Sequence, residues 1–154
     1  MTTTESLTIS RVIDAPAKDI FDVLTLPRNH VSIDASEMVR GAEQGDQRIQ
    51  AVGDVFSMDM FHEKMGGEYR MENHVTGLIE NKLLAWRPAR EGEEPGGWEW
   101  VYELEPEGSQ ATKVSLTYDW SEVRSSKFKS RFPILPAQVL EDTLAQLAAR
   151  VSEK

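Results

Sequence analysis

The chain has 154 residues, a net charge of −9 and no cysteine. Nucleic acids and anionic membranes attract basic surfaces, so we expect this acidic chain to have no nucleic-acid partner. We also expect no membrane insertion, because no run approaches the roughly 20 apolar residues that a membrane-spanning helix requires. Without cysteine there are no disulfides or thiolate sites, and without a signal-peptide pattern the sequence predicts one cytoplasmic domain over residues 1–154.

The first third of the chain predicts a strand followed by two short helices. Apolar and polar residues alternate over residues 7–13, as in a strand with two different faces. Pro16 suits a first helical turn, because its missing N–H would be unpaired there. Apolar residues at helical spacing then predict a helix that ends before Pro27. A second short helical segment should cover residues 27–35.

Two polar side chains of that second segment are candidates for a site. His30 and Asp34 lie four residues apart and therefore share one face of a helix. They could pair with each other at the mouth of a cavity, or each could make only a local polar contact. The sequence leaves both arrangements open.

From residue 37 onward the apolar pattern changes to a period of two, which indicates strands. Consecutive strands joined by short turns must be antiparallel. The alternation gives each strand one apolar and one polar face, so one side of the sheet should be covered. The predicted strands cover residues 38–41, 55–64, 69–75, 83–87, 98–104 and 114–120.

The glycine pair at 66–67 predicts a tight hairpin, because both central residues of such a turn need positive φ. Pairing across a two-residue turn would put Met60 opposite Asn73. It would likewise put His62 opposite Met71. All four side chains would then share the apolar face of the hairpin.

The facing of the next strand is ambiguous, because Gly77 can carry a bulge that shifts the alternation. We expect Leu84 and Trp86 to point inward and Arg87 outward. In the opposite arrangement Arg87 would enter the interior, where a guanidinium could stabilise an enolate. A charged loop rich in glycine and proline should follow over residues 88–97.

The chain ends in a long amphipathic helix, predicted from Pro136 to Ser152. Its apolar stripe consists of Leu140, Leu144, Leu147 and Val151. The predicted fold class is therefore α+β: a curved antiparallel sheet of about seven strands wrapped around this helix, with two short helices after the first strand. One helix cannot fill such a sheet, so either the short helices plug the remainder or a cavity is left.

Several short stretches give the chain a family resemblance. They are Ile13-Asp-Ala-Pro16, Ile20-Phe-Asp-Val-Leu24, Gly53-Asp-Val-Phe56, Leu84-Ala-Trp-Arg87, Trp100-Val-Tyr-Glu-Leu104 and Thr117-Tyr-Asp-Trp120. In this order the chain resembles the helix-grip fold of the START-like superfamily, also called Bet v 1-like or SRPBCC. It is most similar there to the bacterial polyketide cyclase/dehydrase family. The resemblance implies a deep cavity between sheet and last helix for an apolar or aromatic molecule, such as a lipid. It implies no particular reaction.

Large aromatic and methionine side chains gather on the inward strand faces. They are more numerous than packing against a single helix would require. Each of them could equally be a core filler. A buried phenol or amide needs a hydrogen-bond partner in either case. The side chains expected to bind the ligand are Met58, Met60, Tyr69, Asn73, Trp86, Trp100, Tyr102, Tyr118, Leu140 and Leu144.

Binding of a hydrophobic, ring-bearing small molecule is the leading hypothesis. The alternative is an enzyme of the polyketide cyclase, aromatase or dehydratase type. In it Tyr102, Tyr118 and Asn73 would polarise carbonyls, and His62 would act as a base. A third hypothesis is a protein-interaction module that docks through the basic, aromatic segment 124–132. This segment could instead pack as a lead-in to the last helix.

The sequence predicts neither a metal site nor a cofactor. His30, His62 and His74 are spread along the chain without the spacing of metal ligands. The glycine motifs that bind phosphates or dinucleotides are missing from the sequence. The catalytic residues, the identity of the ligand and the oligomeric state, a homodimer included, stay open.

Overall fold

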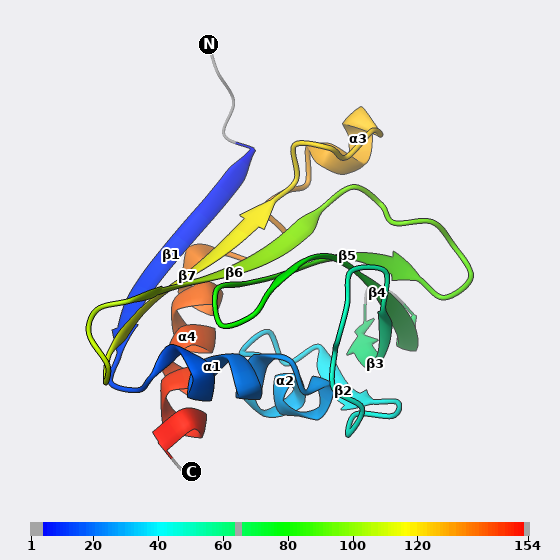
Figure 1. The fold of residues 1–154 in the computed structure, drawn as a ribbon. Helices are drawn as coiled ribbons and strands as arrows, with labels where there is room; N and C mark the ends of the chain where they lie inside the picture. Colours follow the sequence, from blue (N-terminus) through cyan, green and yellow to red (C-terminus); the bar gives the residue numbers. More distant parts are fainter. Residues whose placement is uncertain (1–4, 64–65, 153–154) are drawn as a thin grey trace.

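The computed structural model describes residues 5–63 and 66–152 (Figure 1). In chain order the elements are β1 (Ser6–Ile13), α1 (Ala17–Leu24), α2 (Pro27–Ile33), β2 (Val39–Ala42), β3 (Val55–His62), β4 (Gly67–Ile79), β5 (Leu83–Arg90), β6 (Glu99–Pro106), β7 (Thr112–Asp119), α3 (Ser126–Lys129) and α4 (Ala137–Ser152).

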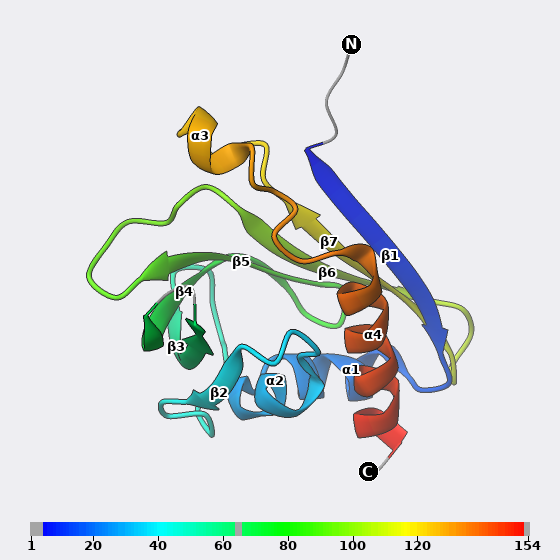
Figure 2. The same ribbon diagram turned by 180° about the vertical axis from the view of Figure 1, so that it is seen from behind.

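The strands form one antiparallel, seven-stranded sheet in the order β1-β7-β6-β5-β4-β3-β2. The sheet curves round the helices (Figure 2). Helix α4 lies against β1 and β7, and α2 bridges α4 and β2. This architecture confirms the predicted α+β fold of a curved sheet gripping a long C-terminal helix. None of the described helices is long and apolar enough to cross a membrane.

The β3–β4 hairpin differs from the prediction in its register. Asn73 was expected opposite Met60 but lies opposite Phe56, and Met71 is displaced in the same way from its expected partner. Side chains alternate along a strand with period two, and the displacement is even. The inward face is therefore the predicted one although the pairing is wrong.

The cause of the shift is the length of the hairpin loop. His62 pairs with Gly67, so four residues separate the paired ends of β3 and β4, whereas the prediction allowed only the glycine pair. Gly66 N–H donates to the carbonyl oxygen of Glu63 at 3.1 Å, which closes the loop. The predicted end of β3 at Lys64 lies outside the described residues.

Strand β5 faces the way we expected. The pairing skips one residue between Val75 and Gly77, which confirms the bulge. Trp86 lies opposite Val75 and is buried on the inward face. Arg87 points outward, where its Nε donates to Oε2 of Glu99 at 3.4 Å. An interior Arg87 is therefore excluded.

Strand β5 also continues to Arg90, through the first residues of the predicted loop 88–97. Pro88 lies opposite Asn73 in the pairing with β4, whereas the pairing with β6 ends at Trp86. Beyond that point one side of β5 has no neighbouring strand. A proline, which cannot donate a ladder hydrogen bond, is accommodated there.

Helix α4 closes the core as its apolar stripe predicted. Leu140, Leu144 and Leu147 are each at most 1% exposed. They belong to one hydrophobic cluster with Ile20 and Leu24 of α1. The packing of α4 against α1 and the β1–β7 side of the sheet thus stabilises the whole fold.

Replacement of Leu144 by alanine should lower the free energy of unfolding by about 3 kcal/mol, because the side chain is fully buried and would leave a cavity. Urea unfolding followed by circular dichroism measures the loss. Glu141→Ala, an exposed substitution on the same helix, should change the value by less than about 0.5 kcal/mol. Equal losses in the two variants would contradict the packing of α4.

Candidate functional site

Aromatic rings on the concave side of the sheet form two groups. The inner group consists of His30, Phe56, Trp86 and Tyr102, with neighbouring ring centroids 5.3 to 6.4 Å apart. The outer group consists of Trp98, Trp100, Tyr118, Trp120, Phe128 and Phe132. Strands β3, β5 and β6 supply three rings of the inner group, and α2 supplies the fourth.

The rings of the outer group fill one another's space. Trp100 and Tyr118 lie opposite each other on β6 and β7 and stack with centroids 4.1 Å apart and planes 2° from parallel. Phe128 and Phe132 pack against Trp98 at 5.7 and 5.8 Å. Packing of these rings against one another is therefore enough to explain why the outer group contains so many aromatic residues.

The histidine of the inner group is positioned by the end of α1. Helix α1 ends at Leu24, and the last carbonyls of a helix have no partner within it. Asn29 Nδ2 donates to the oxygen of Val23 at 3.0 Å, and Nε2 of His30 lies 2.7 Å from the oxygen of Leu24. A carbonyl oxygen only accepts, so Nε2 carries the proton. Burial lowers the pKa of His30, which keeps the ring neutral and leaves a lone pair on Nδ1.

Three polar groups on the concave side lack a partner. The amide of Asn73, the hydroxyl of Tyr102 and Nδ1 of His30 make no hydrogen bond to any described residue. Their side chains are nevertheless buried, at 6%, 3% and 6% exposed. Among residues 5–63 and 66–152, the only fully buried side-chain nitrogen or oxygen without a partner is Nε2 of His74. The unpartnered groups of Asn73, Tyr102 and His30 are therefore not fully buried, and each borders a space that a water molecule can reach.

Asp34 follows α2 beside the inner group. Its carboxylate accepts a hydrogen bond from Oγ of Ser36, and burial raises the pKa of the carboxyl. Burial raises the pKa of Tyr102 too, and the nearby charge of Asp34 adds to that effect. The phenol of Tyr102 consequently stays protonated and can donate a hydrogen bond.

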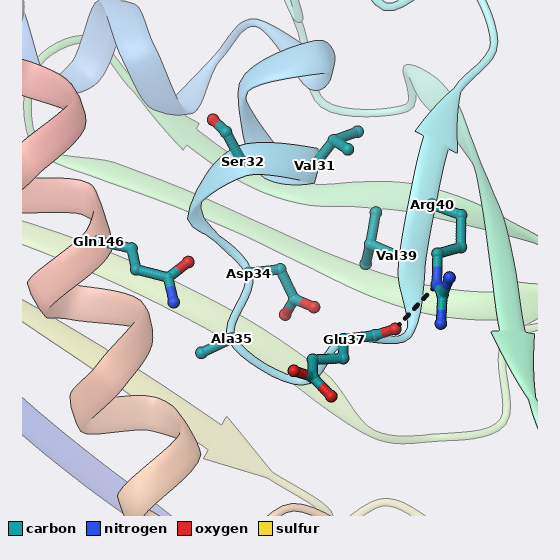
Figure 3. Close-up of a pocket in the computed structure, with 8 residues that line it drawn as sticks. All are labelled: Val31, Ser32, Asp34, Ala35, Glu37, Val39, Arg40 and Gln146. Carbon is teal, nitrogen blue, oxygen red and sulfur yellow. Dashed lines mark hydrogen bonds between the residues drawn. The ribbon is translucent and has the colours of Figure 1, made fainter.

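A pocket of about 540 Å³ opens beside Asp34, between α2, β2 and α4 (Figure 3). Figure 3 shows the Asp34 carboxylate turned toward β2, and Gln146 reaching from α4 toward the α2–β2 connection. Nε of Arg40 donates to the backbone oxygen of Glu37 at 3.0 Å. The other lining residues are Val31, Ser32, Ala35 and Val39. Asp34 thus belongs both to this pocket and to the surroundings of Tyr102.

No family model matches the chain. The chain is 30% identical over 148 residues to the uncharacterized protein Rv0088 of Mycobacterium tuberculosis H37Rv. The match covers 91% of this chain and 62% of that protein. The uncharacterized protein MT0096 of M. tuberculosis CDC 1551 matches to the same extent. The chain therefore spans only 62% of the length of these curated relatives.

Solved structures share the architecture at low sequence identity. Protein Ms6760 from Mycobacterium smegmatis has a TM-score of 0.72 at 15% identity, covering 97% of this chain and 92% of that one. The ZhuI aromatase/cyclase from Streptomyces sp. R1128 has 0.67 at 11%, covering 96% and 93%. A START superfamily protein from M. smegmatis has 0.64 at 14%, covering 97% and 99%. The chain has the START-like fold. At these identities the likeness shows the fold alone.

Within the START-like fold, the predicted ligand residues lie in four places. Around or beside the inner group are Met58, Asn73, Trp86 and Tyr102. In the outer group are Trp100 and Tyr118. In the α4 core are Leu140 and Leu144. Met60 and Tyr69 lie opposite each other near the hairpin end of β3 and β4, and both are half-buried. None of them lines the pocket of Figure 3.

His30 and Asp34 do not pair with each other, because His30 bonds to Leu24 and Asp34 bonds to Ser36. Each side chain makes a local contact, which was the other arrangement that the sequence allowed. The proposed base His62 lies at the hairpin end of β3, six residues from Phe56 of the inner group. The sequence signal for His30 was its place in a helix that directly follows another helix end.

No group of three or more histidine, aspartate or glutamate side chains in the described ranges could hold a metal ion. The polar side chains of Asn73 and of the inner group offer hydrogen bonding and proton transfer. Nδ1 of His30 can accept, Tyr102 can donate, and the amide of Asn73 can do both.

Acidification should destabilise the START-like domain through His30. The pKa of the buried ring is below the ordinary value of about 6.5 that it regains on unfolding, so the unfolded chain binds the extra proton. The free energy of unfolding should fall as the pH is lowered from about 7 to about 5.5. Chemical denaturation at a series of pH values measures this slope.

His30→Phe removes the proton site and should flatten that slope. The variant should also be less stable at neutral pH, because the Leu24 carbonyl loses its donor, so slopes are compared and not absolute values. The raised pKa of Asp34 contributes with the opposite sign in both proteins and cancels in the comparison. Identical slopes would show that His30 is not held neutral by the fold.

Proposed function

We propose that the chain binds a hydrophobic, ring-bearing small molecule on the concave side of its sheet, between β3–β6 and the helices α2 and α4. The observation that carries the proposal is the presence of unpartnered polar groups on Asn73, Tyr102 and His30 within an aromatic wall. Because the protein leaves these three groups to water, a bound molecule that supplies matching hydrogen bonds can replace that water, which supports an external partner. An apolar wall with a few convergent polar groups is the usual composition of a small-molecule site.

In this proposal the predicted ligand residues have different tasks. Asn73 and Tyr102 orient the ligand by hydrogen bonds, and Trp86 supplies a flat apolar surface for its ring. The residues that flank this surface are Met58, Met60, Tyr69 and Trp100. The residues that support it from behind are Tyr118, Leu140 and Leu144. The pocket beside Asp34 is the side from which the ligand approaches.

Asn73→Leu gives the sharpest test. The substitution keeps the side-chain volume and removes no hydrogen bond to any described residue, so the free energy of unfolding should be unchanged or higher. Calorimetric titration with 2-naphthol should show binding to the wild type. Affinity for this probe should be about tenfold weaker in the variant.

His74→Leu is the matched control, because His74 is the next residue on β4 and lies opposite the outward Arg87. Its titration with 2-naphthol should match the wild type. A wild-type affinity in Asn73→Leu, together with a loss of stability, would mean that the amide serves the fold and not a ligand.

One observation favours a second function, proton transfer on a ring ketone. An unprotonated Nδ1 on His30 and a protonated phenol on Tyr102 lie in the same aromatic group, with ring centroids 6.4 Å apart. Tyr102 would donate a hydrogen bond to the ketone oxygen while Nδ1 removes the α-proton, which gives an enolate and a protonated His30 that returns a proton to the carbon. This assigns to His30 the role of base that the sequence had suggested for His62.

α-Tetralone in deuterated water tests the enzymatic function, since deuterium replaces the α-protons and their NMR signal disappears. The wild type should accelerate exchange over buffer. Tyr102→Phe and His30→Phe should each slow the accelerated exchange by at least about tenfold. A wild type that binds 2-naphthol but exchanges α-tetralone no faster than buffer would exclude this function and leave binding.

We do not extend the proposal to a protein-interaction module. Its anchors in segment 124–132 would be Phe128 and Phe132, and both are half-buried against Trp98. The segment packs onto the outer aromatic group before α4 begins, as a lead-in to the helix would.

A further inference from the structure

The orientation of the His30 ring decides what kind of atom can face it. Nε2–H donates to the oxygen of Leu24 at 2.7 Å, so this nitrogen is committed to the fold. The ring packs edge-on against Trp86, with centroids 5.3 Å apart and planes at 83°. Turning the ring over would leave the Leu24 carbonyl buried without a donor. Nδ1 is therefore the nitrogen that remains available.

A neutral ring nitrogen with a lone pair can only accept a hydrogen bond. None of the described side chains donates to it: Phe56 has no donor, and neither Trp86 nor Tyr102 bonds to it. The hydrogen must come from water or from a bound molecule. A ligand that displaces the water without replacing its hydrogen bond would lose affinity.

The charge of the interior sets a second requirement. No lysine or arginine among the described residues is buried, whereas the Asp34 carboxyl lies close enough to Tyr102 to raise its pKa. An anionic group brought to the inner aromatic group would lose its hydration without gaining a cation. Carboxylates and phosphates are therefore disfavoured there.

We infer that the ligand is a neutral ring compound carrying a hydroxyl group, a phenol, an enol or a ring alcohol, whose O–H donates to Nδ1 of His30. This inference rests on the binding function proposed above and names the class of molecule that the same site selects. The amide of Asn73 can donate to the same hydroxyl oxygen, and the hydroxyl of Tyr102 can serve a second oxygen where the ligand has one.

Three naphthalene probes separate the requirements in calorimetric titrations at neutral pH. 2-Naphthol offers a hydroxyl hydrogen, 2-methoxynaphthalene has the same ring without it, and 2-naphthoate is an anion. 2-Naphthol should bind at least about tenfold more tightly than 2-methoxynaphthalene, as expected when one buried hydrogen bond is lost. 2-Naphthoate should bind no better than 2-methoxynaphthalene.

His30→Phe keeps an aromatic ring and removes the lone pair, so its preference for 2-naphthol over 2-methoxynaphthalene should fall to about twofold or less. The matched control is His74→Phe, the same exchange at a β4 residue opposite the outward Arg87, which should keep the wild-type preference. Thermal unfolding of each variant shows that the comparison is made between folded proteins.

Nitrogen-15 NMR of the wild type provides a test that needs no substitution. Addition of 2-naphthol should move the Nδ1 resonance of His30 upfield, as accepting a hydrogen bond does, and 2-methoxynaphthalene should not. An unmoved resonance at saturating 2-naphthol would overturn the inference even if His30→Phe failed to fold.

The outcomes distinguish the inference from the function on which it rests. Equal affinities for 2-naphthol and 2-methoxynaphthalene would overturn the hydroxyl requirement and leave the binding function intact. Tighter binding of 2-naphthoate would overturn the requirement for a neutral ligand. Binding of none of the three probes would overturn both proposals together.

Discussion

The geometry of the concave site depends on how α1 gives way to α2. The last carbonyls of α1 point into the protein and would be unpaired if the next helix did not supply donors. Asn29 and His30 supply them, at 3.0 and 2.7 Å. The bond that satisfies Leu24 also holds the imidazole against Phe56 and Trp86 and determines which nitrogen stays open. A requirement of backbone hydrogen bonding thereby sets the chemistry of the site.

The two aromatic groups show how one sheet face can serve both packing and binding. In the outer group, the parallel stack of Trp100 on Tyr118 and the contacts of Phe128 and Phe132 satisfy the rings by mutual contact. In the inner group the rings surround polar atoms that no described residue satisfies. The sheet needs the first group for stability, whereas the second retains the polarity that a ligand would use.

The START-like fold recurs here at 11 to 15% identity to the solved structures described above. At that identity the likeness shows the curved sheet and its long helix, and it does not carry over the side chains that meet a ligand. Function therefore has to be argued from the inner group itself. The chain spans 62% of the length of its curated relatives, so the activity of those whole proteins is not assigned to it.

The alternation of the strands and the stripe of α4 were enough, by themselves, to determine the fold class and the inward face of every strand except β5, whose facing stayed ambiguous because of Gly77. Even the misjudged hairpin register kept Asn73 inward, because a displacement of four residues preserves a period of two. Sequence periodicity also placed Tyr102 on the concave side and favoured the same side for Trp86. It could not tell which rings pack against each other and which border open space, since that depends on contacts between distant strands. Only the tertiary structure decided that His30 is the interior histidine, because its orientation follows from the unpaired carbonyls of the preceding helix.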